Sequence, residues 1–307
     1  MAVTAQMVKE LREMTGAGMM DCKKALVEVD GNIEAAVDYL KEKGLAKAAK
    51  KAGRVAAEGL VKIAFTDDHK TAAIVEVNSE TDFVSKNEEF VNFVDDLAKL
   101  ALTAETNDIE AFKAMAYEGS TVADVLTAKI AKIGENMSIR RIEKVSGDVV
   151  ASYIHGGGSV GVLVSFDTNA ADNAEFVAMG KNIAMQVAAM SPAYLDEASV
   201  PADVVEKERV INLAQMNEDP KMANKPEQVK AKIIEGKIKK FYTEVCLLDQ
   251  TFVRSDLFDG SVSGYVAQVA KEIGADIKVT GFVRLAKGEG IEKRQDDLAE
   301  EVAKLIK

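Results

Sequence analysis

The same order of elements occurs twice along this chain, and this repetition constrains the fold more than any other feature of the sequence. Each unit opens with apolar residues that alternate with others around a turn, as in a β-hairpin; the expected strands lie at 61–65, 73–77, 149–154 and 160–166. A helix with apolar residues at helical spacing follows each hairpin. Glu89-Phe90-Val91 recurs as Glu175-Phe176-Val177 at the same place. We interpret this as an internal duplication whose two hairpin-plus-helix halves pack on each other.

The helix of the first unit has a marked start. Ser85 and Glu88 have the spacing of a capping box, in which the serine caps the first turn and the acid reaches back, so the helix is expected to begin after Ser85. Its counterpart is expected to begin near Ala174. The other elements expected in the core are helices near 108–118 and 121–133, a strand near 138–145, a helix capped by Ser261 and a strand at 277–283.

The N-terminal 43 residues predict a small bundle of three short helices. Their apolar stripes are separated by glycine-containing breaks, Asn32 is placed to cap the third helix, and Gly44 is placed to end it. Residues 41–54 then carry many lysines and one acid. This basic stretch is either a solvated tether or frayed helix, or a contact for RNA or an acidic partner surface.

A helical segment interrupts the second unit. Residues 203–216 and 224–246 predict an antiparallel helical hairpin, which either protrudes as an arm or folds back on the core. A charged helix is expected from Ile291 to the end of the chain. The chain is thus an α+β protein with five parts: the bundle and basic linker at 1–54, core subdomain one at 55–146, core subdomain two at 147–200 and 247–286, the hairpin at 201–246, and a C-terminal module at 287–307.

Composition narrows the class of protein. Of 307 residues, 48% are hydrophobic and 29% are charged, which is ordinary for a soluble globular chain. The net charge of −11 argues against nucleic acid as a general partner. Cys22 and Cys246 are the only cysteines, which suits a reducing compartment. No apolar run reaches the ~18 residues of a membrane span, and no secretory signal is recognisable, so we expect a cytoplasmic protein.

The residue types that carry chemistry in enzymes are scarce. Two histidines give little material for a metal site or an acid–base relay. Gly156, Gly158 and Gly161 match a dinucleotide-binding spacing, but a strand continues where that site needs a helix, so a hairpin turn explains them better. No phosphate-loop motif is present, and Cys22 lies on an apolar helix face. We expect no catalytic residue, metal, cofactor or direct nucleotide binding, and hence no enzyme.

One short segment has the features of a binding site. Thr81-Asp82-Phe83-Val84 lies between a strand and a helix, so rigid elements hold both of its ends. Phe83 is a large apolar side chain in a polar stretch. Either its ring tucks into the core below the helix start, or it is presented with Asp82 as a wedge for a partner. The corresponding segment of the second unit, 167–173, has no aromatic residue.

Four motifs resemble the bacterial elongation factor Ts family, in its long form with a duplicated core and a coiled-coil insertion. They are Met19-Met20-Asp21-Cys22-Lys23-Lys24-Ala25-Leu26, Thr81-Asp82-Phe83-Val84, Lys132-Ile133-Gly134-Glu135-Asn136 and Gly288-Glu289-Gly290-Ile291-Glu292-Lys293. The resemblance covers essentially the whole chain. It implies a ubiquitin-associated-like N-terminal bundle and a coiled-coil arm. It also implies guanine-nucleotide exchange on the translational GTPase elongation factor Tu, rather than enzyme chemistry.

The resemblance also implies roles for particular residues. The segment Thr81, Asp82, Phe83 and Val84 would enter the GTPase near its Mg²⁺ site and promote GDP release. Secondary docking positions are matched by Arg12, Met19, Met20 and His155. The Gly156-Gly157-Gly158 run after His155 departs from the family's usual pattern. An RNA- or ribosome-binding protein that uses the basic linker is the other function that we consider.

Overall fold

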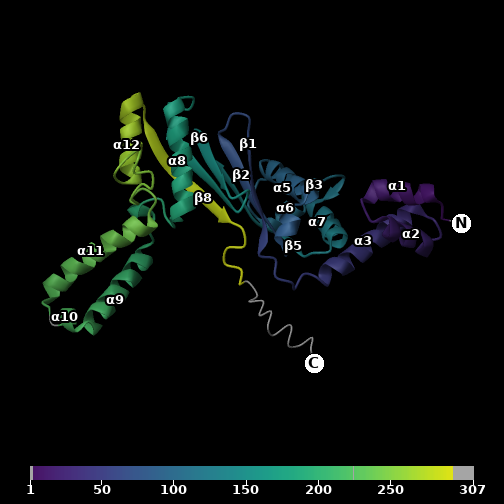
Figure 1. The fold of residues 1–307 in the computed structure, drawn as a ribbon, viewed down its shortest axis with the longest axis horizontal. Helices are drawn as coiled ribbons and strands as arrows, with labels where there is room; N and C mark the ends of the chain where they lie inside the picture. Colours follow the sequence, from purple (N-terminus) through teal and green to yellow (C-terminus); the bar gives the residue numbers. More distant parts are fainter. Residues whose placement is uncertain (1–2, 224, 293–307) are drawn as a thin grey trace.

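The molecule is elongated, with two sheet-and-helix halves in its middle, a helical bundle at one end and a helical hairpin at the other (Figure 1). The computed structural model describes residues 3–223 and 225–292. Mixed helices and antiparallel sheets confirm the predicted α+β class. The predicted division into five parts stays a prediction, and the predicted C-terminal helix lies largely in residues 293–307, outside the described residues.

The N-terminal bundle consists of α1 (Ala5–Thr15), α2 (Met19–Glu28) and α3 (Ile33–Ala49). Thr4 and Asn32 cap α1 and α3, since each side-chain oxygen accepts a backbone N–H of the first turn. The three apolar stripes meet in a core that is small because the helices are short. Its buried residues are Val8, Leu11, Cys22, Ala25, Leu26 and Ala36.

The first half of the core is built on an antiparallel sheet in the order β1-β2-β5. Its strands are β1 (Glu58–Phe65), β2 (Thr71–Ser79) and β5 (Met137–Ser146). The segments between them are α4 (Asp82–Ser85), α5 (Glu88–Ala101), α6 (Ile109–Lys113), β3 (Ala116–Tyr117), β4 (Ser120–Thr121) and α7 (Val122–Ile133). The predicted helix near 108–118 is shorter than expected, because a small β-ribbon takes its last part. α5 buries its apolar stripe against the sheet.

Helix α3 continues past Gly44, where a helix end was predicted. Gly44 is buried, and a Cβ there would lie 3.8 Å from the Cβ of Ala131 and 3.9 Å from Cγ2 of Thr127. Both distances are ordinary van der Waals contacts, so Gly44 lies where α3 packs on α7 and does not end the helix. Residues 41–49 of the basic stretch are thus part of α3, which fits the expectation of a helix rather than that of a tether.

The second half repeats this design with an antiparallel sheet in the order β6-β7-β8. The strands are β6 (Val149–His155), β7 (Val160–Thr168) and β8 (Ile277–Ala286). The sheet is covered by α8 (Ala174–Met190) and α12 (Val262–Ile273), and a short 3-10 helix, η1 (Glu197–Ser199), follows α8. As predicted, Ser261 caps α12, because its Oγ accepts the N–H of Gly264 at 3.2 Å.

The two halves agree in small details. The middle strand of each sheet has a register shift near its end, between Glu76 and Val77 in β2 and between Ser165 and Phe166 in β7. The covering helices α5 and α8 are each capped by an asparagine, Asn87 or Asn173, whose side chain accepts the N–H groups two and three residues later. These shared features support the inferred duplication.

The two sheets pack against each other through a separate apolar cluster: Val61, Ala72 and Ile74 from the first sheet and Val150, Leu163 and Leu285 from the second. Gly161 lies in this interface, where a Cβ would come within 2.5 Å of the Val61 side chain. A hairpin with close backbone approach therefore explains the glycines that match the dinucleotide-binding spacing.

The inserted hairpin consists of α9 (Ala202–Glu218), α10 (Pro220–Ala223) and α11 (Glu227–Val245). It projects away from the two sheets (Figure 1), so the prediction of a protruding arm is confirmed and folding back is wrong. Its two long helices share a narrow apolar seam with Met216, Ile234 and Ile238 as the buried residues. An ion pair between Arg209 and Glu235 joins them outside the seam.

Candidate functional site

The segment Thr81–Val84 presents a large aromatic side chain to solvent. It leaves β2 and forms the single helical turn α4, with Thr81 in extended conformation at its N-cap position. Phe83 is 81% exposed, whereas the next residue, Val84, is buried in the core of the first half. Val84 therefore anchors the turn and leaves Phe83 pointing outward. The alternative prediction, in which the ring of Phe83 tucks into the core, is wrong.

Hydrogen bonds to Glu135 fix the start of the turn. Its carboxylate accepts the backbone N–H of Thr81 at 2.9 Å and the hydroxyl of Thr81 at 2.7 Å. Glu135 reaches this position because α7 ends at Gly134, whose left-handed φ of 91° reverses the chain. A second clamp lies beside the first, where the N–H of Asn136 donates to Glu80 at 2.5 Å. The turn is thus fixed before any partner binds.

The predicted capping box at Ser85 is wrong. The hydroxyl of Ser85 donates to the carbonyl of Asp82 at 2.8 Å, so it closes the short turn α4. Asn87 is the cap of α5, and its side chain accepts the N–H of Glu89 at 2.9 Å. Because α4 takes Ser85 as its last residue, the long helix α5 starts only at Glu88, three residues later. This restart places Phe83 on a separate turn rather than in an extended loop.

Asp82 is the first residue of the turn α4, beside Phe83. Its carboxylate forms an ion pair with Lys86 at 2.6 Å. The hydrogen bond and charge of Lys86, with a smaller contribution from Lys287, hold the pKa of Asp82 below its usual range. Asp82 is therefore ionised at neutral pH, and the segment presents an apolar ring beside a negative charge.

The turn that carries His155 lies at the same end of the sheets. The carbonyl of Gly158 accepts the N–H of Val61 at 2.8 Å, and that of Ser159 accepts the N–H of Lys287 at 2.9 Å. The ammonium of Lys287 binds Glu58, whose strand position pairs with Ser79 just before Thr81. Lys287 therefore links the 155–159 turn to the segment that carries Asp82.

The glycines after His155 have a structural cause. Gly158 has a φ of 106°, and a Cβ there would lie 2.9 Å from the side chain of Leu60. His155 is exposed, and its Nδ1 is 3.1 Å from the hydroxyl of Tyr153. The imidazole of His155 thus lies at the surface.

The other predicted docking residues belong to the N-terminal bundle. Met19 and Met20 open α2 and are 59% and 63% exposed, and Arg12 is exposed in the last turn of α1. The bundle has its own core and is joined to the first half by α3 (Figure 1). The structure therefore connects the turn after His155 to Lys287, while Arg12, Met19 and Met20 are exposed on the N-terminal bundle.

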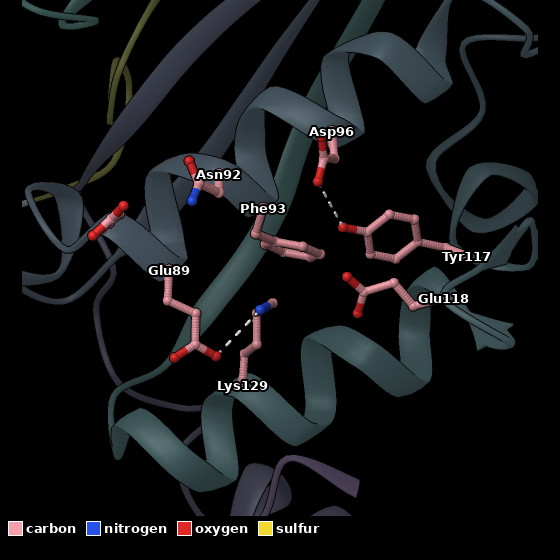
Figure 2. A pocket seen from close by; sticks show the side chains of 8 residues that line it. Glu89, Asn92, Phe93, Asp96, Tyr117, Glu118 and Lys129 are labelled. Carbon is pink, nitrogen blue, oxygen red and sulfur yellow. Dashed lines mark hydrogen bonds and ion pairs between the residues drawn. The ribbon is translucent and has the colours of Figure 1, made fainter. Parts of the chain in front are cut away.

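A separate hollow of about 370 Å³ lies between α5, α7 and the β3–β4 ribbon (Figure 2). Lys129 crosses it, 5.1 Å from the centre of the Phe93 ring and 3.3 Å from the carboxylate of Glu89. Tyr117 donates its hydroxyl to Asp96 at 3.2 Å, and burial together with nearby carboxylates raises its pKa far above the usual range. These side chains satisfy one another across the hollow.

Residues 3–223 and 225–292 contain no group of three or more His, Cys, Asp and Glu side chains that could hold a metal ion. No helix within these ranges is long and apolar enough to cross a bilayer.

Removing the clamp should loosen the exposed turn. Glu135→Ala deletes the acceptor of two charge-assisted hydrogen bonds, each worth about 1.5–3 kcal/mol. We expect the amides of residues 81–85 to exchange with solvent at least about tenfold faster in hydrogen-exchange mass spectrometry. Glu143→Ala is the matched control, because the carboxylate of Glu143 in β5 binds the side chain of Asn107. Equal protection in both variants would show that Glu135 does not hold the turn.

Comparison with known proteins agrees with these observations. A family model described as "Elongation factor TS" matches residues 80–289, and one described as "UBA/TS-N domain" matches residues 3–40. A protein named elongation factor Ts from Clostridioides difficile (strain 630) is 53% identical, with 99% of each chain covered. Proteins of the same name from Clostridium novyi (strain NT) and Clostridium tetani (strain Massachusetts / E88) are 51% and 50% identical, with 97–99% of the chains covered.

Proposed function

The chain belongs to the bacterial elongation factor Ts family, and from this membership we propose that it acts in the cytoplasm as a guanine-nucleotide exchange factor for the GTPase elongation factor Tu. Membership of the family is sufficient to identify a translation elongation factor. The proposal of nucleotide exchange rests on the position of Phe83. Its ring is 81% exposed on a turn that is clamped by Glu135, so a partner can bury it without first ordering the turn.

The proposed mechanism is displacement of the partner's Mg²⁺ and phosphate site. GTPases hold the phosphates of GDP with backbone N–H groups and a Mg²⁺ ion, and Mg²⁺ needs near-ideal octahedral geometry. A ring wedged between partner elements would shift the protein groups and waters around that ion. Asp82 would bring a negative charge to the same place. Either change weakens the hold on GDP.

Binding energy is sufficient for this role. A ~1000-fold faster release requires the barrier to fall by about 4 kcal/mol. We propose that contacts by Thr81, Asp82, Phe83 and Val84 provide the displacement, and that Arg12, Met19, Met20 and His155 add docking contacts. This chain makes and breaks no covalent bond in the mechanism. Its residues therefore act by binding, and no cofactor is needed.

The basic stretch gives less support to an RNA-binding function. Lys47 forms an ion pair with Asp21 at 3.2 Å, and Arg54 with Glu80 at 3.5 Å. The ammonium of Lys51 donates to the carbonyl of Gly134. These cations have partners within the protein, so fewer are available for phosphate groups. We therefore favour the GTPase as the partner.

The proposal predicts a reciprocal effect of GDP. If the protein weakens GDP binding to elongation factor Tu, then GDP must weaken binding of the protein by the same factor. Calorimetric titrations of the GTPase with and without saturating GDP should give affinities for this protein that differ at least about fivefold. An affinity that does not change with GDP would contradict the exchange function, whereas binding to ribosomal RNA alone would favour the other candidate.

A further inference from the structure

Helix α3 links the N-terminal bundle to the first half of the core (Figure 1). Its first part contributes Ala36 to the core of the bundle, and its later part packs on α7, where Gly44 meets Ala131. Apolar packing is non-directional, so it resists the separation of two helices more than it resists sliding or tilting. Further contacts are therefore needed to fix the direction of α3 and, with it, the orientation of the bundle.

The residues that follow α3 supply directional contacts. The ammonium of Lys51 donates to the carbonyl of Gly134, the residue at which α7 ends. The carbonyl of Arg54 accepts the side-chain amide of Asn136 at 2.8 Å. The guanidinium of Arg54 forms an ion pair with Glu80 at 3.5 Å. We call these three contacts the brace, and hydrogen bonds of this kind fix direction as well as distance.

The partners of the brace belong to the structure that fixes the exposed turn. Gly134 and Asn136 flank Glu135, whose carboxylate binds the N–H and the hydroxyl of Thr81. Glu80, which directly precedes Thr81, accepts the backbone N–H of Asn136 at 2.5 Å. The end of α3 is thus attached both to the loop that supplies Glu135 and to the residue before the turn.

An ion pair connects the other end of this arrangement to the exposed methionines of the bundle. Lys47 in α3 binds Asp21 at 3.2 Å. Asp21 lies in the first turn of α2, directly after Met19 and Met20. Lys51 follows Lys47 by four residues and so lies on the same side of the chain. One side of α3 and its extension therefore contacts both the helix of the methionines and the loop that fixes the exposed turn.

We propose that Lys51 and Arg54 are positioning residues, which hold the N-terminal bundle in one orientation relative to the exposed turn so that both surfaces reach a partner together. Two binding surfaces at a fixed separation have a higher effective concentration for each other than two surfaces on a pivoting link. The fixed orientation is a property of the free protein, whereas its effect on binding rests on the proposed function. In this arrangement the basic stretch acts within the molecule.

Distances between spin labels in the free, full-length protein test the orientation. Both native thiols are buried, so the labels react with introduced cysteines. Val27→Cys places one label on α2, at a position that is 58% exposed, and Asp67→Cys places the other on the exposed turn between β1 and β2. Pulsed electron paramagnetic resonance should give a narrow distance distribution. Adding Lys51→Met and Arg54→Met should make the distribution at least about twofold wider.

A matched control removes two other cations of the same stretch. Lys50 is exposed, and Lys43 lies over the ring of Tyr39 within α3 itself. Lys43→Met with Lys50→Met makes the same change in charge, and the distribution should keep its original width. Should the double replacement at the brace fail to fold, Arg54→Met alone keeps the test available, because that side chain is 54% exposed. Arg54→Lys restores the charge opposite Glu80 and should narrow the distribution again.

Calorimetric titration with elongation factor Tu tests the effect on binding. The dissociation constant should rise at least about tenfold for the brace variant and stay at the wild-type value for the control. A distribution that stays narrow in the brace variant would overturn the proposed positioning. A wider distribution with unchanged affinity would overturn the coupling of the two surfaces. If the wild-type protein itself failed to bind the GTPase, the proposed function would be wrong, and the distances would still decide whether the brace fixes the bundle.

Discussion

Replacing Phe83 with alanine is expected to remove most of the acceleration of GDP release from elongation factor Tu, while the protein stays folded. Aromatic residues at the centre of an interface commonly contribute about 2–4 kcal/mol, so acceleration should fall by roughly 30-fold or more. Because the ring is 81% exposed, the free energy of unfolding should change by less than about 0.5 kcal/mol. Stopped-flow release of a fluorescent GDP and urea unfolding measure the two effects.

Val177→Ala is the control for loss of an exposed apolar side chain. Val177 is 56% exposed in the first turn of α8, in the second half. It lies on a helix that covers the second sheet and is not part of the proposed wedge. Acceleration should remain at the wild-type value in this variant. If Phe83→Ala also kept the wild-type acceleration, the wedge would have to be abandoned.

Glu76→Gln is expected to lower the free energy of unfolding by about 3 kcal/mol. Glu76 is fully buried in β2, and its carboxylate lies 2.5 Å from Arg141 and 3.2 Å from Arg140. It also accepts the N–H of Gly288 at 2.8 Å, which ties the segment after β8 to the first sheet. The amide of glutamine has the same shape but no charge. Its single carbonyl oxygen would face four donors, from Asn78, Arg140, Arg141 and Gly288, and the arginines would lose their counter-ion.

Urea unfolding of the two proteins would measure this loss. Asp95→Asn is a suitable control, because the ion pair of Asp95 with Lys62 at 2.9 Å is partly exposed. Such a pair contributes less than about 1 kcal/mol. If Glu76→Gln lowered the free energy of unfolding no more than Asp95→Asn does, the buried carboxylate would not be important for the stability of the first sheet.

Local patterning was sufficient to predict most of the elements. Alternating apolar residues located the hairpins, and helical spacing located α5, α8 and α12. Two errors arose where one residue type serves different purposes. Gly44 was expected to end α3 but instead lies buried inside the helix, where α3 packs on α7. Ser85 was expected to cap α5 but closes α4, and Asn87 is the cap. Sequence spacing does not separate these roles, because tertiary contacts decide between them.

The candidate site could be predicted only in part. The segment around Phe83 stood out as an apolar residue in a polar stretch, but its exposure depends on Val84 filling the core beneath it. Glu135 lies 54 positions further along the chain, so its bonds to Thr81 have no local signal. The motif at 132–136 pointed to a family but did not reveal a clamp. Lys287 is still more remote from Asp82 in sequence, and only the stacked sheets bring them together.

Release of GDP from elongation factor Tu, followed with and without this protein, tests the central claim most directly. The GTPase is loaded with a fluorescent GDP and mixed with excess GTP in a stopped-flow instrument, with the protein at several concentrations below that of the GTPase. We predict that the release rate rises with the protein concentration, by about 100-fold or more at the highest. A release rate that is the same at every concentration would contradict the account.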